Sequence, residues 1–244
     1  MKKILLFLLI SIASYSQNAK IQVKVDSIYY VDTNYKNREY YINYQVTNTT
    51  DNDISFFLIP NALIAETASS STLYTVYKIY QNGIYENMDG PFFEYESLEE
   101  LRLAQIDDIN SIEFKGLSNT VKQNRKTQFA EYLKNYKDEG GLSLDKQWIY
   151  ENQRLLDNIV KLTPNESQKF TIKTLWNKDK YIKNDDLEFY LDDTKTIEFE
   201  LILDLKKQQF KQKLAPEYFA KIENDTNFIE GTFVSNKIEI SFKE

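Results

Sequence analysis

Residues 40–48 read YYINYQVTN, and this stretch decides the fold class. Tyr40, Ile42, Tyr44 and Val46 occupy every second position along it. Because successive side chains of a strand point to opposite faces of a sheet, this period of two predicts a strand with one buried face. The residues at 48–53, which are mainly Asn, Asp and Thr, then predict a turn.

The same alternation recurs in both directions from this strand. Further strands are predicted at 21–25, 54–59, 73–81, 84–86, 170–174, 187–191, 196–205, 233–234 and 238–242. Pro60 is expected to close the strand that begins at Ile54. Roughly seven or more short strands, with turns about every ten residues, predict an antiparallel β-sandwich.

The dipeptide Asn82-Gly83 predicts a tight hairpin turn. Asn and Gly adopt positive φ readily, as both central residues of a type I′ turn require. A two-residue turn at this place sets the register of the flanking strands. Tyr80 is then expected directly opposite Tyr85.

From Ser97 the apolar period changes from that of a strand to that of a helix. Ser97 and Glu100 match a capping box, and the apolar residues that follow are spaced as on one helical face. These residues are Leu98, Leu101, Ile109 and Ile112. Two more amphipathic helices are predicted at 119–137, before Gly140-Gly141, and at 145–162, before Pro164.

The chain is therefore predicted to be mainly β, an antiparallel sandwich interrupted by a helical insertion. Residues 17–95 form the first part of the sandwich, 96–163 the helical insert and 164–244 the second part. The alternative is a pair of separate domains that meet near residue 163. The absence of a Pro-, Gly- or Ser-rich linker there favours one discontinuous domain.

The strand at 40–48 and the stretch at 164–174 resemble the immunoglobulin-like sandwich domains of exported bacterial proteins. The antibody-type pair of cysteines is missing from this chain. The resemblance implies an immunoglobulin-like fold. It does not imply an activity, because unrelated functions share this fold.

Residues 1–16 are expected to be a signal peptide. Lys2 and Lys3 precede an apolar run at 4–10, and the small residue Ser16 stands directly before Gln17. This leader resembles those of exported Bacteroidetes proteins, especially flavobacterial ones. The alternative is a membrane anchor, but the run of about ten residues is short of the roughly 20 that a spanning helix needs.

The leader predicts a periplasmic or secreted protein. Because the chain contains no Cys, it cannot carry the lipid of a bacterial lipoprotein. No later stretch is apolar enough to cross a bilayer, so the mature chain is not expected to insert into the membrane.

The composition excludes several classes of function. The 244 residues include no His and no Cys, which rules out a Ser-His-Asp triad, a catalytic thiolate, an ordinary zinc site and a disulfide framework. The 37 acidic residues outnumber the 30 basic ones, giving a net charge of −7. Nucleic acid is therefore not an expected partner, and no cofactor is expected.

The predicted hairpin carries the best candidate for a binding site. Tyr74, Val76, Lys78 and Tyr80 share one face of their strand, and Tyr85 joins that face across the turn. If this face is exposed, it offers a hydrogen-bonding platform to a protein or carbohydrate of the envelope. If it packs against the second sheet or the helices, the same residues form the edge of the core.

Carboxylates are the remaining catalytic candidates. A pair of them can hydrolyse a glycosidic bond without His or Cys, provided that they face each other across a cleft. Glu99-Glu100 and Asp107-Asp108 are the obvious acidic doublets. We expect both on an exposed helical face, where an acidic first turn complements the helix dipole.

Calcium is the metal to consider, since it binds oxygen ligands alone. Acidic residues lie at three predicted turns, although the same residues favour turns for local backbone reasons. The candidates are Asp51, Asp53, Asp185, Asp186, Asp192 and Asp193. Turn formation is the favoured interpretation.

The sequence thus predicts a non-catalytic binding or assembly module of the bacterial envelope. One alternative is a carboxylate-dependent hydrolase of polysaccharide or cell-wall material. Another is an inhibitor or immunity-type protein that blocks an envelope enzyme.

Overall fold

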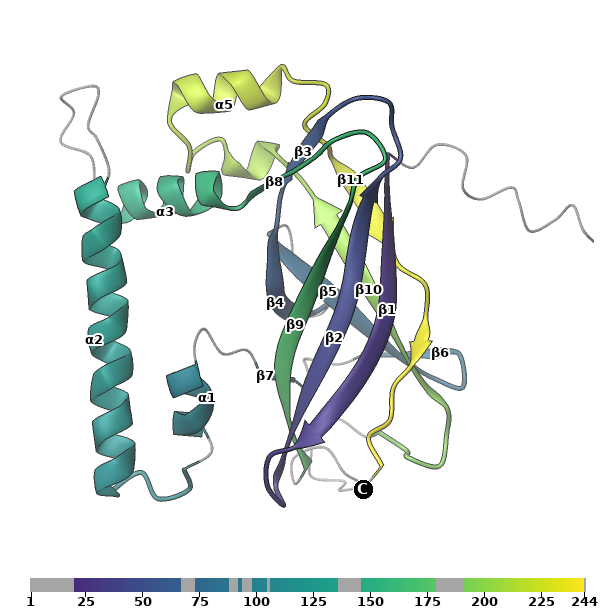
Figure 1. Cartoon of the computed structure of the whole chain (residues 1–244), viewed down its shortest axis with the longest axis vertical. Coiled ribbons are helices and arrows are strands. Elements are labelled where there is room, and N and C mark those ends of the chain that lie inside the picture. Colours follow the sequence, from purple (N-terminus) through teal and green to yellow (C-terminus); the bar gives the residue numbers. More distant parts are fainter. Residues whose placement is uncertain are drawn as a thin grey trace, which may run out of the picture.

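A computed structural model describes residues 20–66, 73–87, 92–93, 98–104, 106–135, 146–178 and 191–243 (Figure 1). Several predictions fall outside these residues. They are the signal peptide at 1–16, the cap at Ser97, the helix end at Gly140-Gly141, the candidates Asp185 and Asp186, and the strand at 187–191 apart from Leu191.

The described residues form strands with helices between them. The strands are β1 (Ile21–Asp32), β2 (Asn37–Asn48), β3 (Ile54–Phe57), β4 (Ile59–Ala65), β5 (Tyr74–Gln81), β6 (Ile84–Glu86), β7 (Phe92–Phe93), β8 (Ile159–Leu162), β9 (Ser167–Asn177), β10 (Ile197–Leu205), β11 (Gly231–Val234) and β12 (Ile238–Glu239). The helices are α1 (Leu98–Ala104), α2 (Ile112–Asn135), α3 (Lys146–Asp157), the 3₁₀-helix η1 (Gln208–Phe210) and α5 (Pro216–Glu223).

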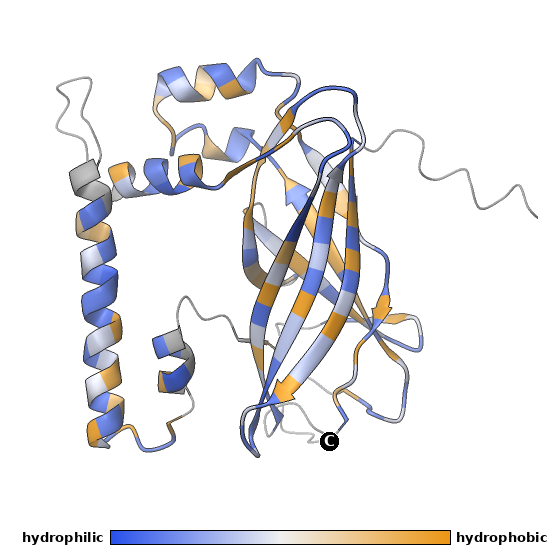
Figure 2. Cartoon of the chain, in the orientation of Figure 1, coloured by the Kyte–Doolittle hydropathy of each residue, from blue (hydrophilic) through white to orange (hydrophobic). Residues whose placement is uncertain are grey.

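The predicted strand at 40–48 is confirmed and lies in the middle of a sheet. This first sheet has the strand order β1-β2-β9-β7, and β2 pairs antiparallel with both β1 and β9. Tyr40, Ile42, Tyr44 and Val46 are all fully buried. Figure 2 shows the alternation of apolar and polar residues along the strands of this sheet.

A second sheet lies behind the first in Figure 1. Its strand order is β11-β10-β5-β4, with β6 paired to β5 and β12 paired to β10. All its pairings are antiparallel except that of β4 with β5, which is parallel. A separate short ladder joins β3 to β8. The prediction of a mainly β chain is confirmed, with sheets that are both antiparallel and mixed.

The core lies between the facing sides of the two sheets. Ile42 and Ile172 of the first sheet and Phe199 of the second are completely buried in one apolar cluster. Towards one end the cluster becomes aromatic, where the rings of Trp176 and Phe242 meet edge to face with centroids 4.8 Å apart. Burial of this apolar area is the main source of stability in a chain without disulfides.

Strands from before and after the helices share each sheet. In the first sheet Tyr40 pairs with Thr174, and in the second Tyr80 pairs with Glu198. The helices α1, α2 and α3 follow each other between β7 and β8. The segment that contains them therefore leaves and returns to one body of strands.

A second apolar cluster joins part of the helical region to the strands. Phe57 of β3 packs against Phe210 and Phe228, with ring centroids 4.9 and 4.8 Å away. Leu155 of α3 and Phe219 of α5 are buried in the same cluster. Figure 1 shows α3 and α5 at the same end of the molecule as β3 and β8, and α2 at the left, apart from the strands.

The predicted strand at 54–59 is wrong in its extent. β3 ends at Phe57, and a new strand, β4, begins at Ile59 and contains Pro60. Pro60 therefore does not close a strand as expected. β4 is the last strand of the second sheet, and an edge strand tolerates a residue without an N–H group on its open side.

The predicted helical face from Leu98 to Ile112 is also wrong. α1 ends at Ala104, and Ile109 and Ile112 are 62% and 91% exposed. A turn separates the two helices, and there the Ser111 hydroxyl accepts a hydrogen bond from the Phe114 N–H group at 3.0 Å. Ser111 thus caps the start of α2.

The third predicted helix is shorter than expected. α3 ends at Asp157, and residues 159–162 form β8, which pairs with β3. α5 was not predicted, although Pro216 in its first turn is a common helix-start residue. Among the described helices, α2 included, none has the length and apolar character needed to cross a membrane.

The Asn82-Gly83 turn is confirmed and yields a prediction. Asn82 has φ 49° and Gly83 has φ 78°, and Gln81 pairs with Ile84 across the turn. A Cβ atom added at Gly83 or at Gly116 of α2 meets nothing within 4 Å, so conformation alone decides the effect. Gly83→Ala should destabilise the protein by about 1–2 kcal/mol.

Gly116→Ala is the matched control and should have the opposite sign. Alanine favours a helix interior over glycine by about 0.5–1 kcal/mol. Urea unfolding followed by circular dichroism measures both effects. If both substitutions changed the free energy of unfolding in the same direction, the turn and helix assignments would be contradicted.

Candidate functional site

Three of the four predicted binding residues lie together on the outer side of the second sheet. Tyr80 pairs with Tyr85 as predicted, and their ring centroids are 5.9 Å apart. The neighbouring side chains of Tyr77 and Ile79 are buried in the core, so Lys78 and Tyr80 occupy the opposite face of β5. The predicted face thus points away from the first sheet, but it is exposed only in part, because Val76 on the same face is 2% exposed.

Charged residues from other parts of the chain complete this surface. The Tyr80 hydroxyl donates to Glu200 Oε2 of β10 at 2.6 Å, and Lys78 Nζ lies 2.8 Å from Glu66 Oε1. Lys237 Nζ lies 3.3 Å from the centre of the Tyr80 ring. We call this set the hairpin face; its members are Glu66, Lys78, Tyr80, Tyr85, Glu200 and Lys237.

The tyrosine hydroxyls of the hairpin face are held in their protonated form. Burial and a hydrogen bond to Glu66 raise the pKa of Tyr85 to about 12. Burial and the carboxylate of Glu200 likewise raise the pKa of Tyr80. Burial alone would raise the pKa of Glu66, but hydrogen bonds from Lys78 and Tyr85 outweigh it and lower that pKa.

Tyr74, the fourth predicted residue, lies apart from the hairpin face. Its hydroxyl accepts a hydrogen bond from Arg154 Nη2 of α3 at 2.8 Å. Its ring also packs against the second apolar cluster. Tyr74 therefore joins α3 to the second sheet, which sequence periodicity along β5 could not reveal.

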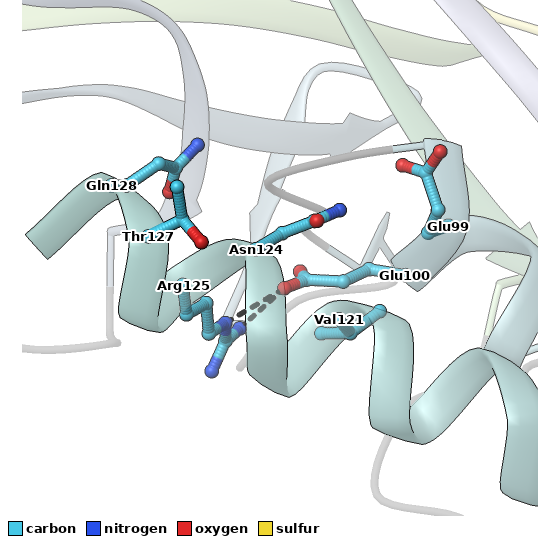
Figure 3. Close-up of a pocket in the computed structure, with 7 residues that line it drawn as sticks. All are labelled: Glu99, Glu100, Val121, Asn124, Arg125, Thr127 and Gln128. Atoms are coloured by element: carbon cyan, nitrogen blue, oxygen red, sulfur yellow. Dashed lines mark hydrogen bonds and ion pairs between the residues drawn. The ribbon is translucent and has the colours of Figure 1, made fainter. Parts of the chain in front are cut away.

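Contrary to expectation, the acidic doublets do not both lie on an exposed helical face: the Glu100 side chain in α1 is only 13% exposed, and Asp107 and Asp108 lie in the connection between α1 and α2. Figure 3 shows the carboxylates of Glu99 and Glu100 pointing in different directions. Glu100 Oε1 accepts hydrogen bonds from Arg125 Nε at 2.9 Å and Nη2 at 2.6 Å. These residues line an open cleft of about 330 Å³ between α1 and α2, together with Val121, Asn124, Thr127 and Gln128.

The second doublet is also engaged by a cation. Asp107 Oδ2 lies 3.0 Å from the Nζ atom of Lys36, a residue of the loop between β1 and β2. Asp108 instead accepts the backbone N–H of Asn110 at 2.9 Å. This contact shapes the turn before α2, as Asp commonly does.

The described calcium candidates lie at turns. Asp51 and Asp53 are exposed beside the β2–β3 connection. Asp192 Oδ1 accepts hydrogen bonds from the Thr194 N–H group at 3.1 Å and its hydroxyl at 2.6 Å. Within the described ranges, no group of three or more acidic side chains is placed to hold a metal ion.

A further aromatic surface was missed by the sequence analysis. β1 continues to Asp32, well beyond the predicted 21–25, and its Tyr29, Tyr30 and Val31 are 50%, 41% and 50% exposed. The register shifts between Val25 and Ser27, so the alternation that marks the first half of β1 is broken. The β-branched and aromatic run at 28–31 was the available signal.

Tyr29 and Tyr41 form a stacked pair on the outer face of the first sheet. Their rings are 4.9 Å apart and nearly parallel, with an interplanar angle of 3°. Lys173 Nζ of β9 lies 4.8 Å from the Tyr41 ring centre. The three residues come from β1, β2 and β9, so the row crosses three strands.

A buried arginine fixes the other side of the same hairpin. Arg38 is 1% exposed; it donates to Asp32 Oδ1 at 2.7 Å and to the Lys243 carbonyl at 2.7 Å. The Tyr30 ring lies 3.8 Å from its guanidinium carbon, and Lys178 Nζ lies 3.2 Å from Asp32. Arg38 thereby ties β2 to the end of β1 and to the C-terminal segment.

No family model, curated protein or solved structure matches this chain.

The lowered pKa of Glu66 predicts a pH-dependent stability. A carboxyl whose pKa is lower in the folded state stabilises above its unfolded value of about 4.3, and this effect is lost as pH falls through the folded value. Glu66→Gln should therefore destabilise the protein at pH 7, by at most about 1 kcal/mol because the pair is partly exposed. Near pH 2 the two proteins should be equally stable.

The exposed Glu131 of α2 provides the control. Glu131→Gln should change the free energy of unfolding by less than Glu66→Gln at pH 7. Urea titrations at both pH values measure the difference. An effect of Glu66→Gln that persists at pH 2 would contradict the ion-pair account.

Proposed function

We propose that the protein is a non-catalytic binding module that is exported to the periplasm or the cell exterior. It recognises a protein or carbohydrate of the envelope through the hairpin face. The observation that carries this proposal is the gathering of Lys78, Tyr80 and Tyr85 with three charged residues on the side of the second sheet that faces away from the core.

Preorganisation supports the binding role. Tyr80 is held by Glu200, and Lys78 is held by Glu66, before any ligand arrives. Side chains that are already ordered lose less entropy on binding. Tyrosine adds a large contact area with few rotatable bonds, a property that binding surfaces commonly use.

The charge of the hairpin face indicates the kind of ligand. Glu66 and Glu200 offset Lys78 and Lys237, so the surface carries both signs without an excess of either. Such a surface suits a ligand with many hydrogen-bonding groups and little net charge, such as a neutral glycan or a mixed protein surface. An inhibitor of an envelope enzyme is one form of the protein-binding case.

Binding is favoured over carboxylate hydrolysis by the state of the acidic doublets. Arg125 engages Glu100, and Lys36 engages Asp107. A hydrolase needs two carboxyl groups that face each other across the scissile bond. Glu99 and Glu100 diverge instead (Figure 3).

The export and the immunoglobulin-like arrangement belong to this proposal as well. The predicted leader at 1–16 supplies the route, and the mainly β body supplies a rigid support for the hairpin. Binding sites on such scaffolds are commonly carried by hairpins and loops.

Replacing the two hairpin tyrosines tests the proposal. Tyr80→Ala and Tyr85→Ala should each weaken binding at least about tenfold, because tyrosines at interfaces often contribute a large share of the binding energy. Stability should change little, since a cross-strand pair contributes about 0.2–1 kcal/mol. Binding is measured against purified peptidoglycan, envelope polysaccharide and solubilised envelope proteins of the source cell.

Tyr218→Ala is the matched control. Tyr218 of α5 is as exposed as Tyr85, at 38%. The Tyr218→Ala variant should bind the same fractions as tightly as the unmodified protein does. Unchanged binding by both hairpin variants would exclude the hairpin face as the site, and the absence of binding to all three fractions would overturn the module itself.

A further inference from the structure

The outer edge of β1 carries a side-chain cap at one residue, Val25, and the edge is open beyond the bulge that follows it. β1 is the terminal strand of this sheet. At Val25 the side-chain amide of Asn236 occupies the edge, accepting from the Val25 N–H group at 2.9 Å and donating to its carbonyl at 3.2 Å. Beyond the bulge that follows, no such cap is found among the described residues.

The hydrogen-bond pattern identifies the open backbone groups. The Thr33 N–H group donates to the Asn37 carbonyl at 3.0 Å at the end of the β1–β2 hairpin. In an antiparallel pair, hydrogen-bonded and non-hydrogen-bonded residue pairs alternate. Ile28, Tyr30 and Asp32 therefore direct their backbone groups away from β2, and in the described part of the chain nothing bonds to them there.

The other sheet edges offer less. β7, at the opposite edge of the first sheet, has two residues, and β11 has four. β4 contains Pro60, which lacks an N–H group. The open half of β1 also exposes Tyr29, Tyr30 and Val31, which are aromatic or β-branched and pair well across strands.

We infer that this edge pairs with the same edge of a second copy of the chain, in an antiparallel arrangement with its two-fold axis at Tyr30. Tyr30 then faces the partner's Tyr30, and Ile28 faces the partner's Asp32. This register uses every outward backbone group of the open segment, giving about six hydrogen bonds. On the outer face Tyr29 lies opposite the partner's Val31.

The charges around the segment select this register. A two-fold axis at Tyr29 instead places Asp26 opposite the partner's Asp32, and like charges directly opposite each other are unfavourable. With the axis at Tyr30, Asp32 lies opposite the uncharged Ile28 of the other copy, and the pairs formed by Tyr29, Tyr30 and Val31 carry no charge. The segment is therefore complementary to itself, which is what an isologous interface requires.

A second copy is favoured as the occupant because two-fold pairing covers the outward backbone groups of Ile28, Tyr30 and Asp32 in both copies at once. Each open β1 edge covers the other, and the Asn236 cap stops the ladder from extending towards Lys20. The first sheets of two copies then form one continuous sheet. The hairpin face lies on the second sheet and stays free, so a dimer presents two binding faces and gains from multivalent attachment.

Sedimentation equilibrium from about 1 to 300 µM tests the dimer. The unmodified protein should dimerise in this range, because a single strand pairing makes a small interface. Val31→Lys should weaken dimerisation at least tenfold, since an edge lysine opposes strand pairing. Val234→Lys is the matched control, because Val234 is 51% exposed on edge strand β11, and it should dimerise normally.

A cysteine variant tests the position of the axis, since the chain has no other Cys. Tyr30→Cys should form a disulfide-linked dimer under mild oxidation, because paired residues about 5.5 Å apart at Cα lie in the range that a disulfide spans. Tyr218→Cys should stay largely uncrosslinked. A monomeric unmodified protein at 300 µM, equal effects of the two lysine variants, or equal crosslinking of the two cysteine variants would each overturn the inference.

Discussion

The buried face of β2 is the constraint on which the rest of the structure depends. Tyr40, Ile42, Tyr44 and Val46 are all withdrawn from water on one side of a strand that has a partner on each edge. The tyrosine hydroxyls find acceptors, since Tyr40 donates to the Ser241 carbonyl at 2.6 Å and Tyr44 to the Pro60 carbonyl at 2.8 Å. Aromatic bulk is therefore buried here without an unpaired hydroxyl on β2, which would be unfavourable. Its partner β9 follows the helical segment in the sequence, whereas β2 precedes it. The pairing of β2 with β9 therefore holds the two parts of the chain together.

The two surfaces that we assign to binding both depend on this body but lie on different sheets. The hairpin face is built on β5 and β10, whose inner residues Ile79 and Phe199 are packed in the core. The β1 edge is positioned by β2 through the Tyr29–Tyr41 stack on one face and the buried Arg38 on the other. Both surfaces are thus extensions of rigid strands, which keeps the entropy loss on binding small.

Local chemistry made part of this predictable from the sequence. The strict alternation at 40–48 specifies strand β2, and the Asn82-Gly83 turn specifies the pairing of β5 with β6, including Tyr80 opposite Tyr85. Tertiary contacts decided the remainder. The bulge after Val25 breaks the alternation of apolar residues, so the second half of β1 was not predicted. Residues 159–162 have the apolar spacing of a helix, but pairing with β3 makes them a strand. Glu66, Glu200 and Lys237 join the hairpin tyrosines only through the sheet, so their positions along the chain carry no sign of it.

Native-state hydrogen exchange at increasing urea concentration tests the central claim, that strands from both sides of the helical segment form one cooperative body. Amides of β2, β5, β9 and β10 should share one opening free energy, equal to that of global unfolding. Amides in the middle of α2, which is mostly exposed, should open at a lower free energy. Separate opening free energies for the strands before residue 98 and those after residue 158 would contradict the account.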